Sequence, residues 1–164
     1  MILLTTKRLM IRNFEASDLD ELTDYRNHVL CYKYQRGQYR DRSDLAIFIE
    51  QAKEHDLFSA GKKHFAVADK VSGSLVGDIF VSVKEATVSL GFTVSYKHHR
   101  QGYAYEFLTA LMEAYHQQFE DYEVIACVDQ ENHASIQLLS KLQFENKGYI
   151  KQIDSLVFCK YEKN

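Results

Sequence analysis

The sequence of 164 residues has no proline, no tryptophan and only three cysteines. Without proline, the boundaries between helices, strands and loops must be inferred from glycine, serine, asparagine and aspartate. Cys31, Cys127 and Cys159 are odd in number and widely spaced, which argues against a disulfide framework or a zinc site. They are typical of buried, reduced thiols in a cytoplasmic protein, and we expect no metal site.

The chain also lacks a long apolar run and a strong charge of one sign. No apolar stretch could span a bilayer, and the N-terminus from Met1 to Arg8 has too short an apolar part for a signal peptide. A formal net charge of -3 does not favour a dedicated nucleic-acid binder. The length fits one domain with a substantial core. We therefore expect a single cytoplasmic domain, residues 1–164, that binds neither membranes nor nucleic acid.

Strand-like and helix-like hydrophobic patterns alternate along the chain. The expected elements are a strand at 8–14, a helix capped by Ser17 or Asp18 and running to about Asn27, a loop at 31–41, a helix capped at Ser43–Asp44 and running to Glu54, strands at 64–68, 75–83 and 87–94, a helix at 102–119, a strand at 122–128, a helix at 132–142, and strands at 144–150 and 155–161. We expect the continuously apolar strand at 122–128 to be buried on both faces.

The connection between two of these strands sets the expected topology. A crossover leads from the strand at 87–94 through the helix at 102–119 to the strand at 122–128, which makes the two strands parallel neighbours. The fold class is therefore mixed α/β, with one sheet flanked by helices. A ligand is expected at the C-terminal ends of these two strands, beside the start of the long helix.

The most informative segment is the short basic loop between the strand that ends at Val94 and the helix that begins at Gly102. A helix start offers unpaired backbone N–H groups and the positive end of the helix dipole. Gly102 has no side chain to hold an anion away from those groups, and Lys97 and Arg100 add positive charge. The loop therefore predicts a binding site for a phosphate or pyrophosphate.

These residues also resemble the GNAT superfamily of acetyl-CoA-dependent N-acetyltransferases. His99–Ala104 corresponds to the family's Gln/Arg-x-x-Gly-x-Gly/Ala loop, with His99 in place of the usual Gln or Arg and Val94 at the expected distance before it. Asn132–Ser135 followed by Leu138–Phe144 is similar to the family's Asn-x-x-Ser helix and its Lys-Leu-Gly-Phe sequence. The motifs extend over nearly the whole chain.

Two further segments are similar to the RimJ/RimL branch of that family, the ribosomal-protein-alanine N-acetyltransferase type. Thr6–Arg12 matches the branch's Thr-x-Arg-Leu-x-Leu-Arg opening, and Gly102–Glu106 matches its Gly-x-Ala-x-Glu. The resemblance implies a mostly antiparallel sheet with a central, splayed parallel strand pair, and acetyl-CoA as cofactor.

The resemblance also implies where coenzyme A binds. The backbone of Arg100–Ala104 would hold its pyrophosphate, and the free edge of the splayed strand would hold the pantetheine arm and polarise the thioester carbonyl. Asn132 is either a pantetheine ligand or only a helix cap. The expected cofactor-binding residues are Phe92, Thr93, Val94, His99, Arg100, Gln101, Gly102, Tyr103, Ala104 and Asn132.

The catalytic residues are less clearly marked. Ser135 matches a serine that lies near the sulfur and could protonate the leaving thiolate, and it could equally be an ordinary first-turn residue. Leu139 and Ser89 stand where many relatives carry a tyrosine acid and a glutamate base. The alternatives for a base are Asp78, Glu15, His98 and His99, and the sequence does not choose among them.

The expected activity is transfer of an acetyl group from acetyl-CoA to a primary amine, either a protein N-terminus or a small molecule. In relatives the region that corresponds to the basic, aromatic loop Tyr32–Arg40 edges the acceptor site. The loop favours an acidic or carboxylate-bearing acceptor or a peptide, or it is only a solvated surface loop whose tyrosines pack on the helices. The rival functions are a transferase for another acyl-CoA and a coenzyme A-binding protein whose catalysis is weak or lost. The oligomeric state is open, and a homodimer is compatible with the sequence.

Overall fold

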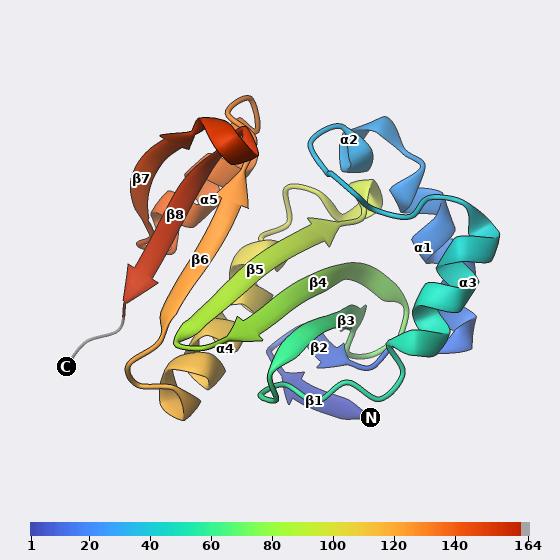
Figure 1. Ribbon diagram of the computed structural model, residues 1–164. Helices are drawn as coiled ribbons and strands as arrows, with labels where there is room; N and C mark the ends of the chain where they lie inside the picture. The colour runs from blue at the N-terminus through green and yellow to red at the C-terminus, as the bar shows by residue number, and fades with distance from the viewer. Residues whose placement is uncertain (162–164) are drawn as a thin grey trace.

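The computed structural model describes residues 1–161 and contains one eight-stranded sheet, in the order β1-β2-β3-β4-β5-β6-β8-β7 (Figure 1). The strands are β1 (Ile2–Thr5), β2 (Leu9–Arg12), β3 (Gly61–Asp69), β4 (Leu75–Lys84), β5 (Thr87–Val94), β6 (Glu123–Val128), β7 (Glu145–Ile150) and β8 (Ser155–Tyr161). Among these strands β5 and β6 are the parallel pair, and the other pairings are antiparallel. The mixed α/β fold with a central parallel pair is therefore confirmed.

Helices cover both faces of the sheet. They are α1 (Leu19–Arg26), α2 (Val29–Tyr32), α3 (Arg42–Gln51), α4 (Tyr103–Gln118) and α5 (His133–Lys141), with short 3-10 turns at Ala16–Asp18, Tyr96–His98 and Lys151–Ile153. None of the helices in the described part of the chain has the length and apolar character needed to cross a bilayer.

The alternation of side chains along each strand divides the core in two. Phe65 on β3 belongs to the larger core, which the long helix α4 and the end of α5 cover with residues such as Phe107 and Leu139. Ala66, the next residue, belongs to the smaller core, which is built from α1 and α3 with residues such as Leu22 and Phe48. The sheet is thus anchored on both sides.

Three local expectations were wrong. Asp41, rather than Ser43 or Asp44, caps α3, because its Oδ1 accepts the N–H of Ser43 at 2.9 Å. The short helix α2 lies partly within the stretch expected to be a loop. Strand β6 is not buried on both faces: Cys127 is exposed, because no helix covers that side of the strand's end.

The parallel pair β5–β6 is incomplete, and this opens the sheet. Its register runs from Thr87 opposite Glu123 to Leu90 opposite Ala126 and then stops, although both strands continue. Beyond that point their ends diverge as a V (Figure 1). We call this opening the V-slot; its two walls are Gly91–Val94 of β5 and the end of β6.

One buried group makes the fold sensitive to pH. Burial lowers the pKa of His64 to about 4, so the ring is neutral in the folded protein at pH 7. An unfolded histidine titrates near pH 6.5. The unfolded state therefore takes up a proton below pH 6.5 that the folded state takes up only near pH 4, and stability should fall across that window.

We expect His64→Gln to flatten the decline in the free energy of unfolding between pH 6.5 and pH 4. Urea denaturation at several pH values measures it, with the exposed His133→Gln as the control. An unchanged slope in His64→Gln would remove this residue from the acid response.

Candidate active site

A pocket of about 550 Å³ occupies the V-slot and the space beside the start of α4. Its walls come from α2 and the following loop, from β5, from the segment between β5 and α4, and from α5. Every residue expected to bind the cofactor lines it, and so does Ser135. The structure thus brings together in one hollow residues that lie up to 43 positions apart in the sequence, from Phe92 to Ser135.

The loop before α4 presents backbone N–H groups to this pocket. Arg100 and Gly102 both have left-handed backbones, with φ of 62° and 75°. The first bond of the helical pattern runs from the Glu106 N–H to the Gly102 carbonyl at 3.1 Å, so the N–H groups of Tyr103, Ala104 and Tyr105 fall outside that pattern. Such a concave turn at the start of a 16-residue helix is suited to a pyrophosphate.

A cluster of polar contacts fixes this helix start in place. Glu106, in the first turn of α4, accepts hydrogen bonds from the Thr6 hydroxyl, the Arg8 N–H at 2.9 Å and Arg8 Nε at 2.7 Å. Arg8 Nη1 also donates to the Gln101 carbonyl at 2.9 Å, and its guanidinium lies 4.4 Å over the Tyr103 ring. The two segments that resemble the RimJ/RimL branch therefore contact each other, and together they hold the loop before α4 in place.

The free edge of β5 faces the V-slot. The Ser95 N–H donates to the Val76 carbonyl at 2.8 Å, so the alternation of an antiparallel pair directs the N–H and C=O groups of Phe92 and Val94 away from β4. Both carbonyls already have partners: Gln35 Nε2 donates to Phe92 O at 3.2 Å, and His99 Nε2 lies 2.8 Å from Val94 O. Because a carbonyl only accepts, His99 carries its proton on Nε2.

Asn132 and Ser135 lie on one turn at the start of α5. Asn132 Oδ1 accepts the Ser135 N–H at 3.2 Å, so Asn132 is the helix cap, and both residues also line the pocket. The two expectations for Asn132 are thus compatible, because its amide nitrogen is not used by the cap. Ser135 is half-buried, with its hydroxyl on the turn that borders the pocket.

A protein family described as the acetyltransferase (GNAT) domain matches residues 8–145, which is most of the chain. The chain belongs to the GNAT acetyltransferase family. The family recognised from the sequence is therefore confirmed.

Relatives of this GNAT chain agree in fold and extent. An uncharacterized N-acetyltransferase of Bacillus subtilis, YnaD, is 25% identical over 151 residues, covering 91% of this chain and 86% of YnaD. A GNAT-family acetyltransferase from Bacillus anthracis superposes with a TM-score of 0.80 at 22% identity, covering 97% and 96% of the two chains. RimL, a ribosomal L7/L12 alpha-N-protein acetyltransferase solved in complex with coenzyme A, superposes with a TM-score of 0.78 at 15% identity, covering 98% of each chain.

In this GNAT protein, the two positions where the resemblance leads us to look for an acid and a base, Leu139 and Ser89, lie outside the pocket. Leu139 is fully buried in the core, and Ser89 lies on β5 where that strand still pairs with β6; neither lines the pocket. Of the base alternatives, His98 and His99 line the pocket. Glu15 instead belongs to a capping box at the start of the first 3-10 turn.

Asp78, the last of the candidate bases, is a buried residue of the core. It is 2% exposed, pairs with Arg26 at 3.2 Å and accepts the hydroxyl of Tyr25. Burial beside this carboxylate raises the pKa of Tyr25 well above its ordinary value, so the phenol stays protonated and remains a donor. A carboxylate with both oxygens engaged in this way is a structural group rather than a free base.

Several pocket residues were not anticipated from the sequence. They are Leu30, Cys31, Tyr105, Ala134, Gln137, Leu138 and Lys141, whereas Tyr34 and Gln35 belong to the loop Tyr32–Arg40 that was expected at the acceptor site. The basic loop Tyr32–Arg40 was expected at the acceptor site, but its charges are largely engaged: Arg40 lies 3.9 Å over the Tyr32 ring, and Arg36 pairs with Asp129 at 3.0 Å. The loop therefore gives little support to an acidic acceptor.

The described residues contain no group of three or more histidine, cysteine, aspartate or glutamate side chains placed to hold a metal ion. Cys31, Cys127 and Cys159 are all free thiols, and Cys31 and Cys159 are buried. Burial raises the pKa of the Cys31 thiol to about 11, so this pocket residue is a poor nucleophile at neutral pH.

Proposed function

We propose that this protein binds acetyl-CoA in the pocket at the V-slot and transfers its acetyl group to a primary amine. The observation that carries the proposal is the meeting of the anion-binding loop before α4 with the free edge of β5 in one pocket. A long, flexible ligand whose pantetheine arm joins a pyrophosphate to a terminal thioester fits this pair of features. Membership in the GNAT family supports the same activity.

Each wall of the pocket has a defined role in binding acetyl-CoA in this proposal. When bound, acetyl-CoA supplies an activated acetyl thioester. The backbone N–H groups of Arg100–Ala104 hold the negative pyrophosphate, and the edge N–H groups of Phe92 and Val94 are placed to donate to the thioester carbonyl and to the negative charge that develops on its oxygen. Asn132 would hold the pantetheine arm through its amide.

The amine must lose a proton, because free amines are mostly protonated near neutral pH. His98 lines the pocket and is half-buried, so it is the base alternative that remains after His99 is tied to Val94 and Asp78 to Arg26. The leaving thiolate must gain a proton. Ser135 is the candidate donor, because its hydroxyl lies on the pocket wall three residues after Asn132, the proposed pantetheine ligand.

The acceptor class follows the relatives. RimL is an alpha-N-protein acetyltransferase of ribosomal L7/L12, so a protein N-terminus is the first acceptor to test, with small primary amines beside it. The leucine at position 139 and the serine at position 89 favour one alternative, a coenzyme A-binding protein with weak catalysis. Turnover with a panel of amines separates the two.

The first experiment is a calorimetric titration of the purified protein with acetyl-CoA and with coenzyme A. Binding in the micromolar range supports the proposal and justifies screening amines and peptide N-termini. Absence of binding to both ligands would contradict it, because the loop from His99 to Ala104 would then be only the start of a helix.

Replacing Ser135 with alanine tests its role as the acid. We expect Ser135→Ala to lower kcat by about 10²-fold while the Kd for coenzyme A changes less than twofold, since general acid catalysis contributes on this scale. Steady-state kinetics and calorimetry measure the two quantities. Ser140→Ala on the outer side of the same helix is the matched control, because Ser140 only bonds the Ile136 carbonyl at 2.9 Å. Equal turnover in Ser135→Ala and the wild type would remove Ser135 from the mechanism.

A further inference from the structure

The loop that follows α2 touches both walls of the V-slot. On the β5 side, Gln35 Nε2 donates to Phe92 O at 3.2 Å, and Gln38 Nε2 donates to Thr93 Oγ1 at 3.3 Å. On the other side, the neighbouring residue Arg36 reaches across to the end of β6 and to the turn before β8. The loop therefore bridges the opening just where the two strands separate.

The contacts of Arg36 are numerous and all lie on the far wall. Nη1 donates to the Ile153 carbonyl at 2.9 Å and to Ser155 Oγ at 3.0 Å. Nη2 pairs with Asp129 Oδ2 at 3.0 Å and with Asp154 Oδ2 at 3.7 Å. The planar guanidinium thus satisfies a fork of oxygens, a geometry that lysine cannot reproduce.

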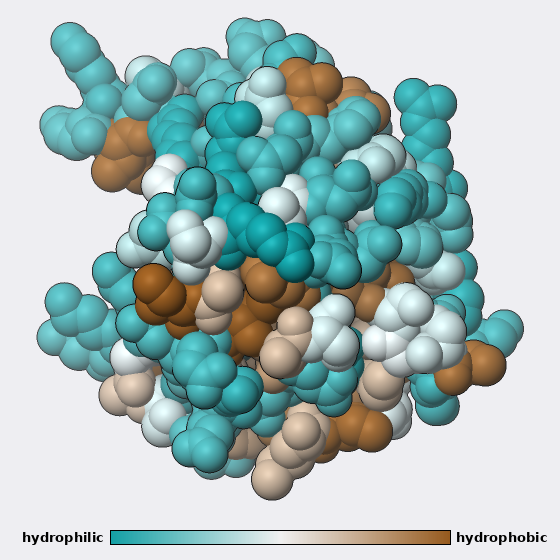
Figure 2. Space-filling view, turned by 90° about the vertical axis from the view of Figure 1, so that its right-hand side faces the viewer, coloured by the Kyte–Doolittle hydropathy of each residue, from teal (hydrophilic) through white to brown (hydrophobic). Residues whose placement is uncertain are grey.

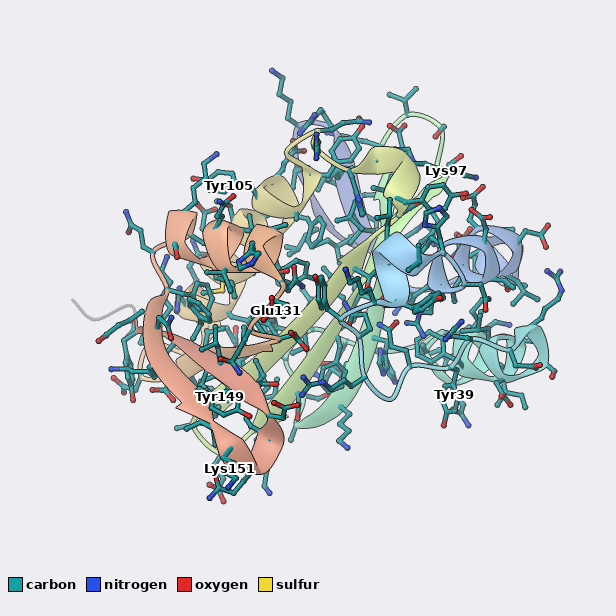
Figure 3. The ribbon with its side chains drawn as sticks, turned by 90° about the horizontal axis from the view of Figure 1, so that it is seen from above. Tyr39, Lys97, Tyr105, Glu131, Tyr149 and Lys151 are labelled. Atoms are coloured by element: carbon teal, nitrogen blue, oxygen red, sulfur yellow. The ribbon has the colours of Figure 1, made fainter. Side chains whose placement is uncertain are left out.

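The view from above shows the elements on the two sides of the V-slot (Figure 3). Tyr149 and Lys151 lie on the β7–β8 side and Tyr39 lies on the side of the α2–α3 loop, with Glu131 between them (Figure 3). Tyr149 donates to Asp154 at 2.7 Å, so the carboxylate that Arg36 approaches is itself held in place. The far wall is therefore ready to receive the guanidinium.

We call the contacts between Arg36 and the far wall the bridge. The bridge can open, because its side chains are exposed to solvent. The Arg36 side chain retains 46% of its exposure and Asp154 retains 72%. Exposed ion pairs are weak and are screened by salt. Residues 33–41 of the loop are mostly polar or charged. The face that carries α1 and α3 is largely hydrophilic around a central apolar patch (Figure 2).

We infer that Arg36 controls the access of the acceptor amine to the pocket by tying the loop after α2 to the far wall of the V-slot. This inference rests on the proposed function, because it assumes that the anion-binding loop holds the cofactor on the α4–α5 side. The side closed by Gln35 and Arg36 is then the one left for the acceptor. Bulky acceptors need the bridge to open, and small amines need it less.

Two variants break the bridge from opposite walls. Arg36→Gln removes the guanidinium, and Asp129→Asn removes its strongest partner while keeping Oδ1, which accepts the Glu131 N–H at 2.9 Å. Arg42→Gln is the control, since it removes the same charge nearby but breaks only the exposed pair with Asp20. The acceptors are a hexapeptide with a free N-terminus and ethanolamine.

We expect kcat/KM for the hexapeptide, relative to ethanolamine, to rise about three- to fivefold in Arg36→Gln and Asp129→Asn, the range that one exposed ion pair can supply. The double variant should show no gain beyond Arg36→Gln, because that change already removes the contact with Asp129. High salt should raise the same ratio in the wild type and leave Arg36→Gln unchanged. The affinity for acetyl-CoA should stay the same in all variants. A purely structural link would instead change both acceptors alike, and that result would overturn the inference.

A second readout needs no turnover. Cys31 and Gln35 line the same pocket, so alkylation of Cys31 by N-ethylmaleimide, followed by peptide mass spectrometry, reports how open this side is. We expect a several-fold faster reaction in Arg36→Gln, with the buried Cys159 unchanged as the internal reference. An unchanged Cys31 rate would contradict the bridge, whereas loss of acetyl-CoA binding in the wild type would contradict only the proposed function.

Discussion

Gly102→Glu is expected to abolish acetyl-CoA binding, with a loss of at least about 100-fold in affinity. The glutamate would place a negative charge at the turn whose N–H groups are proposed to hold a pyrophosphate. Because the helix start stabilises negative charge, the carboxylate would compete with the pyrophosphate for these groups and repel it. The backbone at Gly102, with φ of 75°, is also unfavourable for any residue with a Cβ. Calorimetry with acetyl-CoA measures the effect, and circular dichroism checks that the variant is folded.

Two further glycine variants separate charge from strain. Gly73→Glu introduces the same residue at nearly the same φ of 77°, in the turn between β3 and β4, with open space around it. It should cost stability and leave acetyl-CoA binding intact. Gly102→Ala adds the strain without the charge, and its Cβ would lie 3.6 Å from Arg8 Nη2, an ordinary contact. A folded Gly102→Glu protein with wild-type affinity would reject this loop as the pyrophosphate site.

The pocket could be predicted because its chemistry is local in the sequence. The strand that ends at Val94, the basic loop and the glycine at position 102 follow one another within nine residues, and the physics of a helix start needs nothing more. Likewise the crossover through α4 required the parallel pairing of β5 and β6 that the structure has. Elements with strong periodicity, such as α4, were placed to within a residue or two.

The supporting contacts could not be predicted in the same way. Arg8 and Glu106 are separated by 98 positions, and Arg36 and Asp129 by 93. Periodicity says which side chains face solvent, and it does not say which charged pair will meet across the fold. Local ambiguity had a different origin: Asp41, Ser43 and Asp44 are all good caps, and only the backbone decides that Asp41 accepts from the other two.

The apolar run in β6 gave a wrong prediction of burial on both faces, and the reason is physical. Parallel strands in the middle of a sheet are usually covered on both faces, so Val124–Val128 favoured complete burial. Here the pairing with β5 stops at Ala126, and the strand end that borders the V-slot leaves Cys127 exposed. The departure from the rule therefore coincides with the V-slot, where the sheet opens.

Asp78→Ala should lower the free energy of unfolding by about 3–5 kcal/mol, the usual cost of leaving one partner of a buried ion pair alone. Arg26 is only 3% exposed, and the hydroxyl of the fully buried Tyr25 donates to the same carboxylate. Removing Asp78 leaves the buried guanidinium of Arg26 and the buried hydroxyl of Tyr25 without their carboxylate acceptor. Asp78 also lies opposite Thr93 in the β4–β5 register, so it supports the strand that forms one wall of the pocket.

Urea denaturation of three variants checks this expectation. Asp78→Asn keeps an acceptor for Tyr25 and should lose less than Asp78→Ala, while Asp20→Ala breaks the exposed pair with Arg42 and should cost less than about 1 kcal/mol. A loss below 1 kcal/mol in Asp78→Ala would mean that water or Tyr25 rearranges to satisfy Arg26. At a temperature where the Asp78→Ala variant remains folded, its turnover should stay within a few-fold of the wild-type value. A structural carboxylate permits that, whereas a general base would cost about 10²-fold or more.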